Sequence, residues 1–147
     1  MGLGSGLDPR DKWKLGRWGE ALVYEVLLAR AAPGAKVRWM NAIEETRAPY
    51  DLLVETPEGN GRWRTTFIEV KTTAHPDKNV FEVSPAEYEF FQTGFQGGGS
   101  GNFHLYRVYA NLAGAAGGVP RPRIVVVTDV ARALELKAVK LCLAVMR

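Results

Sequence analysis

Cysteine is nearly absent from this chain of 147 residues, in which Cys142 is the single example. One cysteine cannot form an internal disulfide, so a disulfide-rich secreted scaffold is excluded, and the low count suits a reducing compartment. The chain also lacks any apolar run near the roughly 18 residues of a membrane span, and its start has no apolar signal-peptide core. These absences predict an intracellular protein, in the nucleus or the cytoplasm, with no membrane partner.

What is present is the composition of one globular domain. Hydrophobic residues make up 46% of the chain and charged residues 24%, which excludes a disordered tail. The net charge of +3 permits a polyanionic partner without requiring one. We predict that the glycine-rich residues 1–11 form a flexible linker or a cloning remnant, and that residues 12–147 form the domain.

The hydrophobic pattern predicts an α/β domain built on a mixed sheet. The expected helices cover residues 11–32 and 85–93, with a turn or short helix at 129–136; the expected strands cover residues 36–40, 50–55, 63–72, 79–83, 102–109, 123–128 and 139–145. Ser84 and Glu87 form a capping-box signature at the second helix. The continuous apolar run at 123–128 predicts a central strand, and residues 95–101 and 111–122 predict flexible loops.

The first predicted helix repeats apolar residues at helical spacing, namely Leu15, Trp18, Leu22, Val26 and Ala29. Glu20 lies on another, partly apolar side of this helix with Gly16 and Val23. Glycines such as Gly16 and Gly19 cost up to about 1 kcal/mol each relative to alanine, and glycines kept in a helix often permit a close backbone approach. If this side packs on the sheet, Glu20 comes close to the acidic residues considered next.

Basic and aromatic residues alternate at the start of the same helix. Lys14 and Arg17 lie beside Trp13 and Trp18, a mixture that phosphate contacts and base stacking require. We therefore predict that Lys14 and Arg17 bind substrate. In the alternative interpretation, Trp18 belongs to the core and the basic side chains face water.

The residues that carry chemistry lie on the predicted hairpin. Alternate residues of a strand share a face, so Glu69 and Lys71 point the same way, roughly 6–7 Å apart along the strand. Asp51 begins the partner strand and approaches Glu69 when the two strands pair. Thr72 and Thr73 follow the lysine and either contact a metal ion or phosphate, or reflect only the β-propensity of threonine.

The charges of this group favour a bound cation. Two like charges about 4 Å apart cost about 4 kcal/mol at an effective dielectric constant of 20, so either a carboxyl pKa rises or a cation binds. An all-oxygen donor set suits Mg²⁺ or Mn²⁺. Such an ion activates a bound water and contacts a phosphate, and Lys71 can orient that water. The same residues also fit an exposed ion pair worth under about 1 kcal/mol, and the pattern alone leaves both interpretations open.

The chain resembles the PD-(D/E)XK nuclease superfamily. The resemblance lies in Asp51, in the Glu-Val-Lys triplet at 69–71 and in the helix that bears Glu20. More closely, five segments in order resemble the family of C-terminal domains named after the plant protein NO VEIN, which also occurs in bacterial proteins beside helicase and restriction-like modules. These segments are residues 16–24 (GRWGEALVY), 49–52 (PYDL), 67–73 (FIEVKTT), 81–84 (FEVS) and 105–108 (LYRV).

The resemblance implies a fold and a set of roles. The fold is a restriction-endonuclease-like core, a mixed β-sheet flanked by helices in the order α-β-β-β-α-β with extra C-terminal strands. Asp51, Glu69 and the Val70 main-chain carbonyl would hold Mg²⁺ or Mn²⁺, Glu20 would be the acid carried by the helix, and Lys71 would be the catalytic lysine.

The resemblance also implies an activity and partners. The expected activity is metal-dependent hydrolysis of phosphodiester bonds in DNA or RNA. The alternative is a catalytically inactive module of the same fold that binds nucleic acid or protein, because a fold does not fix a function. A helicase or ATPase part in a longer chain and a homodimer are further expectations.

Overall fold

The computed structural model describes residues 9–43, 46–93, 102–111 and 121–142. In chain order the elements are α1 (Pro9–Arg30), β1 (Lys36–Trp39), β2 (Leu52–Gly59), β3 (Arg62–Thr73), α2 (Pro85–Thr93), β4 (Asn102–Tyr109), β5 (Arg123–Val127) and α3 (Val130–Glu135). The five strands form one sheet in the order β1-β2-β3-β4-β5, in which only the β3–β4 pair is parallel. The predicted α/β class with a mixed sheet is confirmed.

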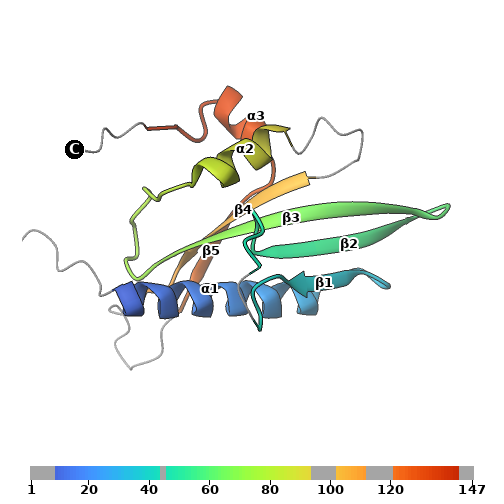
Figure 1. Cartoon of the computed structure of the whole chain (residues 1–147), viewed down its shortest axis with the longest axis horizontal. Helices are drawn as coiled ribbons and strands as arrows, with labels where there is room; N and C mark the ends of the chain where they lie inside the picture. Colours follow the sequence, from blue (N-terminus) through green and yellow to red (C-terminus); the bar gives the residue numbers. More distant parts are fainter. Residues whose placement is uncertain (1–8, 44–45, 94–101, 112–120, 143–147) are drawn as a thin grey trace, which may run out of the picture.

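Helices cover both faces of this sheet. Figure 1 shows α1 along one side and α2 and α3 together on the other. The core against α1 is built from Val23, Leu52, Ile68, Val70 and Val108, and the core against α2 and α3 from Phe91, Phe103, Leu105 and Val130. None of the helices among the described residues is long and apolar enough to cross a membrane.

The side of α1 that carries Gly19 and Val23 is the side that packs on the sheet. Val23 is fully buried, and a Cβ added to Gly19 would collide with the side chain of Thr72 on β3. The expected close backbone approach therefore occurs at Gly19, whereas a Cβ at Gly16 would meet nothing. Trp18, a candidate core residue on the other apolar stripe, is 39% exposed.

The predicted hairpin is confirmed as β2 and β3. Leu52 pairs with Ile68 in antiparallel register, and the pairing shifts near Gly59 before the turn. Gly59, Asn60 and Gly61 all have positive φ angles, which glycine and asparagine adopt most readily. The hairpin fixes which residues of the two strands lie opposite one another, and thereby positions the site.

Three strand predictions are wrong in part or in full. The strand predicted at 123–128 is β5 and lies at an edge of the sheet, where Val125 and Val126 are about 40% exposed. Residues 79–83 form no strand, and this segment is instead held by side chains: Arg107 donates to the Lys78 carbonyl and the Tyr109 hydroxyl bonds Asn79.

The strand predicted at 139–145 is absent over its described residues, 139–142. There, the Val139 N–H donates to the Ala133 carbonyl and so closes the end of α3 instead of joining the sheet. Four predicted segments lie wholly or partly outside the described residues. The parts outside are residues 1–8 of the linker, the loop at 95–101, most of the loop at 111–122 and residues 143–145 of the last strand.

Candidate active site

Asp51 lies immediately before β2 and is fixed to β3 by two hydrogen bonds. Its N–H donates to the Ile68 carbonyl at 2.8 Å, and its Oδ2 accepts the Val70 N–H at 2.8 Å. The antiparallel register pairs Leu52 with Ile68, so Asp51 comes opposite Glu69. The ring of Tyr50 packs on Phe67 with centroids 4.9 Å apart, which holds the chain in place before the aspartate.

Glu69 and Lys71 share the face of β3 that is covered by α2. The Lys71 Nζ lies 3.1 Å from a carboxylate oxygen of Glu69, as the strand alternation predicts. Glu69 itself is only 5% exposed. A pair buried to this extent is not the exposed ion pair of the alternative interpretation, because a solvated pair would leave both charges in water.

Glu87 on α2 completes the group and was not predicted as a site residue. Its Oε2 lies 2.9 Å from the Lys71 Nζ and also accepts the Ser84 N–H at 2.9 Å. In return the Glu87 N–H donates to the Ser84 hydroxyl at 3.1 Å. The capping box expected from the sequence is therefore present, and the carboxylate that closes it also binds the lysine.

Glu20 approaches Asp51 from the other side of the sheet. Its Oε2 accepts the Trp39 indole N–H at 2.7 Å and lies 3.8 Å from Arg17. Glu20 and Asp51 line the same pocket, which has a volume of about 350 Å³. The structure thus places Asp51 between Glu20 on α1 and Glu69 on β3. No three acidic, histidine or cysteine side chains among the described residues are grouped so as to hold one metal ion.

The carboxyl groups at the centre of this arrangement hold their protons tightly. Burial, followed by the charge of Glu20, raises the pKa of Asp51 to about 7, although the hydrogen bond from Val70 acts in the opposite direction. Burial, followed by the charge of Asp51, raises the pKa of Glu69 to about 9. Burial lowers the pKa of Lys71, but Glu69 and Glu87 outweigh burial and raise it overall. The lysine is therefore charged, and the site carries more acid than its cations neutralise.

The four predicted substrate-binding residues have different surroundings. Lys14 is exposed on α1. Arg17 donates to the main-chain carbonyls of Asn41 and Ala42, so its guanidinium ties α1 to the segment after β1. The Thr72 hydroxyl is buried without a hydrogen-bond partner among the described residues, and the buried Thr73 accepts the N–H of His75 at 3.2 Å. Contacts of these residues with substrate stay predictions.

Fold and site together define a class: an α/β domain whose central hairpin carries a buried acid–lysine group beneath helices on both faces. Residues 19–125 match the family model described as the C-terminal region of protein NO VEIN. The chain belongs to this family, as its sequence segments predicted. Glu20, Asp51, Glu69, Lys71 and Glu87 all fall within the matched span.

Two plant proteins are similar to this chain. It is 37% identical over 75 residues to protein NO VEIN-LIKE of Arabidopsis thaliana and 35% identical over 75 residues to protein NO VEIN of the same plant. Each similarity covers 51% of this chain, but only 11% and 3% of the two plant proteins. No solved structure matches the chain.

Proposed function

We propose that this domain has a restriction-endonuclease-like core and hydrolyses phosphodiester bonds of DNA or RNA with a divalent metal ion. The observation that carries the proposal is the buried group of Asp51, Glu69 and Lys71, in which the lysine lies 3.1 Å from Glu69. This group has the residue types and strand positions of the PD-(D/E)XK nucleases that the sequence resembles. Two carboxylates and an ammonium on adjoining strands can hold a cation and a phosphate at the same place.

The chemistry of the donor set fits Mg²⁺ or Mn²⁺. All the donors are hard oxygens. Burial first, and neighbouring carboxylates second, raise the pKa values of Asp51 and Glu69, and a bound cation would favour their charged forms. Mg²⁺ keeps several waters and is commonly held by only one or two protein carboxylates together with substrate phosphates. Asp51 and Glu69 would therefore suffice, with the Val70 carbonyl as a further donor, whereas Glu20 is not grouped with both of them around one ion. The ion would lower the pKa of a bound water and polarise the phosphate.

Lys71 supplies the positive charge that the protein itself brings to the reaction. It is protonated between Glu69 and Glu87, so it can stabilise negative charge that develops on a phosphate oxygen. If Glu69 held a metal ion, Glu87 would still hold the ammonium. The capping box fixes Glu87, and with it the direction of the lysine.

A catalytically inactive binding module is the second candidate, and one observation favours it. Lys71 lies between two carboxyl groups, that of Glu69 at 3.1 Å and that of Glu87 at 2.9 Å, and this arrangement joins α2 to β3. A purely structural lysine would have the same contacts. In that case the surface of the domain would bind nucleic acid or protein without turnover.

Mn²⁺ titration calorimetry on the wild type and on Asp51→Asn tests the proposal. We expect binding by the wild type and a loss of at least tenfold in affinity for Asp51→Asn. The matched control is Glu58→Gln, which removes an exposed carboxylate near the hairpin turn and leaves binding unchanged. The titration is repeated with a single-stranded oligonucleotide, because substrate phosphates complete such sites.

Binding lost only in Asp51→Asn justifies a cleavage screen over single-stranded, double-stranded and branched DNA and RNA. If the wild type binds no Mn²⁺ up to millimolar concentrations, with or without oligonucleotide, the metal-dependent mechanism is wrong. The binding module would then be the better account of the site.

A further inference from the structure

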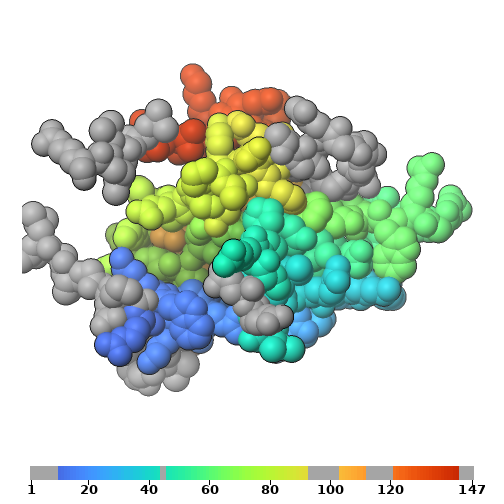
Figure 2. Space-filling view, in the orientation of Figure 1, coloured from blue at the N-terminus to red at the C-terminus, as the bar shows by residue number. Residues whose placement is uncertain are grey.

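A pocket of about 350 Å³ adjoins the acid–lysine group between α1 and the segment that follows β1. Its lining comes from three places: α1 (Trp13, Gly16, Arg17 and Glu20), the segment after β1 (Asn41 and Ile43), and Asp51. Figure 2 shows the first half of α1, in blue, beside the teal segment that leads to β2 on one face of the molecule. Its volume is at the lower end of the range for small-molecule sites.

The walls of this pocket are held together by protein contacts. Arg17 donates to the carbonyls of Asn41 and Ala42, and so joins α1 to the opposite wall. The same guanidinium lies 4.6 Å from the centre of the Trp39 ring and 5.8 Å from that of Trp13. The Trp13 ring therefore lies next to a guanidinium that is itself anchored to the opposite wall.

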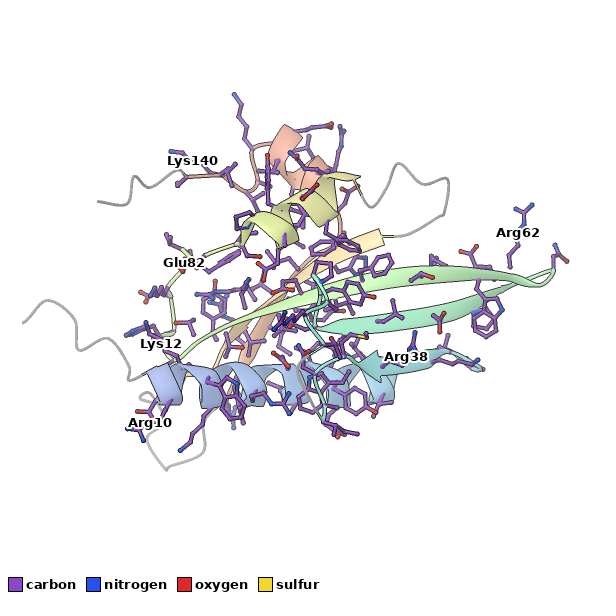
Figure 3. All side chains as sticks on the ribbon, viewed as in Figure 1. Arg10, Lys12, Arg38, Arg62, Glu82 and Lys140 are labelled. Carbon is purple, nitrogen blue, oxygen red and sulfur yellow. The ribbon has the colours of Figure 1, made fainter. Side chains whose placement is uncertain are left out.

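Trp13 is 64% exposed although it lines the pocket. A large aromatic ring exposed at the entrance of a site offers a flat surface for another ring. Residues 10–17 around it carry four basic side chains and one acidic one, and Arg10 and Lys12 project from the first turn of α1 (Figure 3). Basic side chains near an exposed aromatic ring are the combination that binds a nucleic-acid strand, since one contacts phosphates and the other stacks on bases.

We propose that this pocket takes one unpaired nucleobase, stacked on Trp13, next to a phosphate that the metal ion proposed at Asp51 would hold. This inference rests on the proposed function and narrows its substrate to single-stranded or locally unpaired nucleic acid. In a duplex both faces of each base are covered by neighbouring base pairs, so a base must be unpaired or turned out of the helix to offer a face.

Fluorescence anisotropy with labelled oligonucleotides tests the proposal on the whole chain. The probes are a deoxythymidine strand, a uridine strand of equal length and their blunt duplexes with complementary strands. Ca²⁺ replaces Mg²⁺ as the oxygen-ligand ion, and a gel verifies that each probe stays intact. The variants are Trp13→Ala and Trp13→Phe, with Trp63→Ala as the matched control. Trp63 is 47% exposed and adjoins Arg62, at the far end of the hairpin (Figure 3).

We expect Trp13→Ala to weaken single-strand binding roughly 5- to 150-fold, the range for loss of one base–aromatic stack. Trp13→Phe retains most of the affinity because it keeps an aromatic face, Trp63→Ala binds like the wild type, and the duplexes bind more weakly. Equal affinities of Trp13→Ala and Trp63→Ala, or a preference for duplex, would overturn the stacking site while leaving the metal-binding test of the proposed function intact. If the wild type binds none of the probes, both the stacking site and nucleic acid as the substrate are wrong.

Discussion

The carboxylate of Glu87 lies 2.9 Å from the Lys71 ammonium and, with the same oxygen, accepts the N–H of Ser84 at the start of α2. One side chain therefore both closes the helix cap and orients the lysine. Because α2 holds Lys71 through this carboxylate, the position of the ammonium depends on how this helix begins. Variants that break either the helix cap or the contact with Lys71, but not both, can therefore distinguish a structural from a catalytic role for the lysine.

Glu87→Gln should impair cleavage more than folding. Glutamine keeps an oxygen that accepts the Ser84 N–H but loses the charge, so the free energy of unfolding should fall by about 1 kcal/mol. Loss of this carboxylate also lowers the pKa of Lys71, because Glu87 is one of the groups that raise it. We expect a reduced cleavage rate and a shift of the alkaline limb of the pH–rate profile to lower pH.

The matched control for this variant is Ser84→Ala. It removes the cap hydroxyl at a cost of about 1 kcal/mol and leaves the contact between Glu87 and Lys71 in place. If the two variants are equally stable but only Glu87→Gln cleaves more slowly than the wild type, Glu87 positions the lysine for catalysis. Equal cleavage by both variants would mean that Glu87 acts only as a cap.

In the absence of metal, the free energy of unfolding of Asp51→Asn should increasingly exceed that of the wild type as the pH rises. Below the unfolded pKa of 3.8 the carboxyl is protonated in both states, and between there and the folded pKa of about 7 the folded state holds the proton more tightly. The wild type therefore loses stability over this pH window, whereas asparagine has no proton to lose. At pH 8 we expect Asp51→Asn to be more stable by on the order of 1–3 kcal/mol.

Thermal unfolding in the presence of a chelator, at several values between pH 4 and pH 8, measures this difference. The exposed Asp77→Asn serves as control and should follow the wild type. Added Mn²⁺ should raise the Tm of the wild type and not that of Asp51→Asn, because only the intact site gains binding free energy. A variant that is less stable than the wild type at every pH would contradict this prediction.

Lys71→Ala should abolish cleavage and leave metal binding largely intact. The substitution removes the ammonium that lies 3.1 Å from Glu69, while both proposed metal ligands stay in place. Loss of one group that stabilises charge in a transition state typically costs 100- to 1,000-fold in rate, so we expect a loss of at least about 100-fold. Wild-type cleavage by this variant would contradict the assignment, and the exposed Lys140→Ala is the control for loss of a surface charge.

The parts of the site that lie on one hairpin could be predicted from the sequence. Strand alternation places Glu69 beside Lys71, and the order of strand, turn and strand brings Asp51 opposite Glu69. These inferences need only local geometry. The contact of Glu87 with Lys71 could not be predicted, because it depends on how α2 docks on the sheet, through Phe90 against Phe67 and Phe103.

The place of β5 in the sheet shows the same limit. Residues 124–127 are apolar without interruption, which is typical of a strand buried on both faces. Among the strands that the structure describes, β5 pairs with β4 alone, and its valines at 125 and 126 remain partly exposed. Composition reports how apolar a strand is, whereas the order of strands is decided by long-range pairing.

The contact between α1 and β3 makes a pair of glycines respond oppositely to the same substitution. A Cβ at Gly19 would collide with the Thr72 side chain, while a Cβ at Gly16 would meet no atom within 4 Å. Gly19→Ala should therefore push α1 away from the sheet and lower the free energy of unfolding by about 1–3 kcal/mol or more. Gly16→Ala should be neutral or stabilising by up to about 1 kcal/mol, since alanine favours the helix. Denaturant unfolding of both variants measures the difference, and equal effects would show that α1 does not approach Thr72 as closely as described.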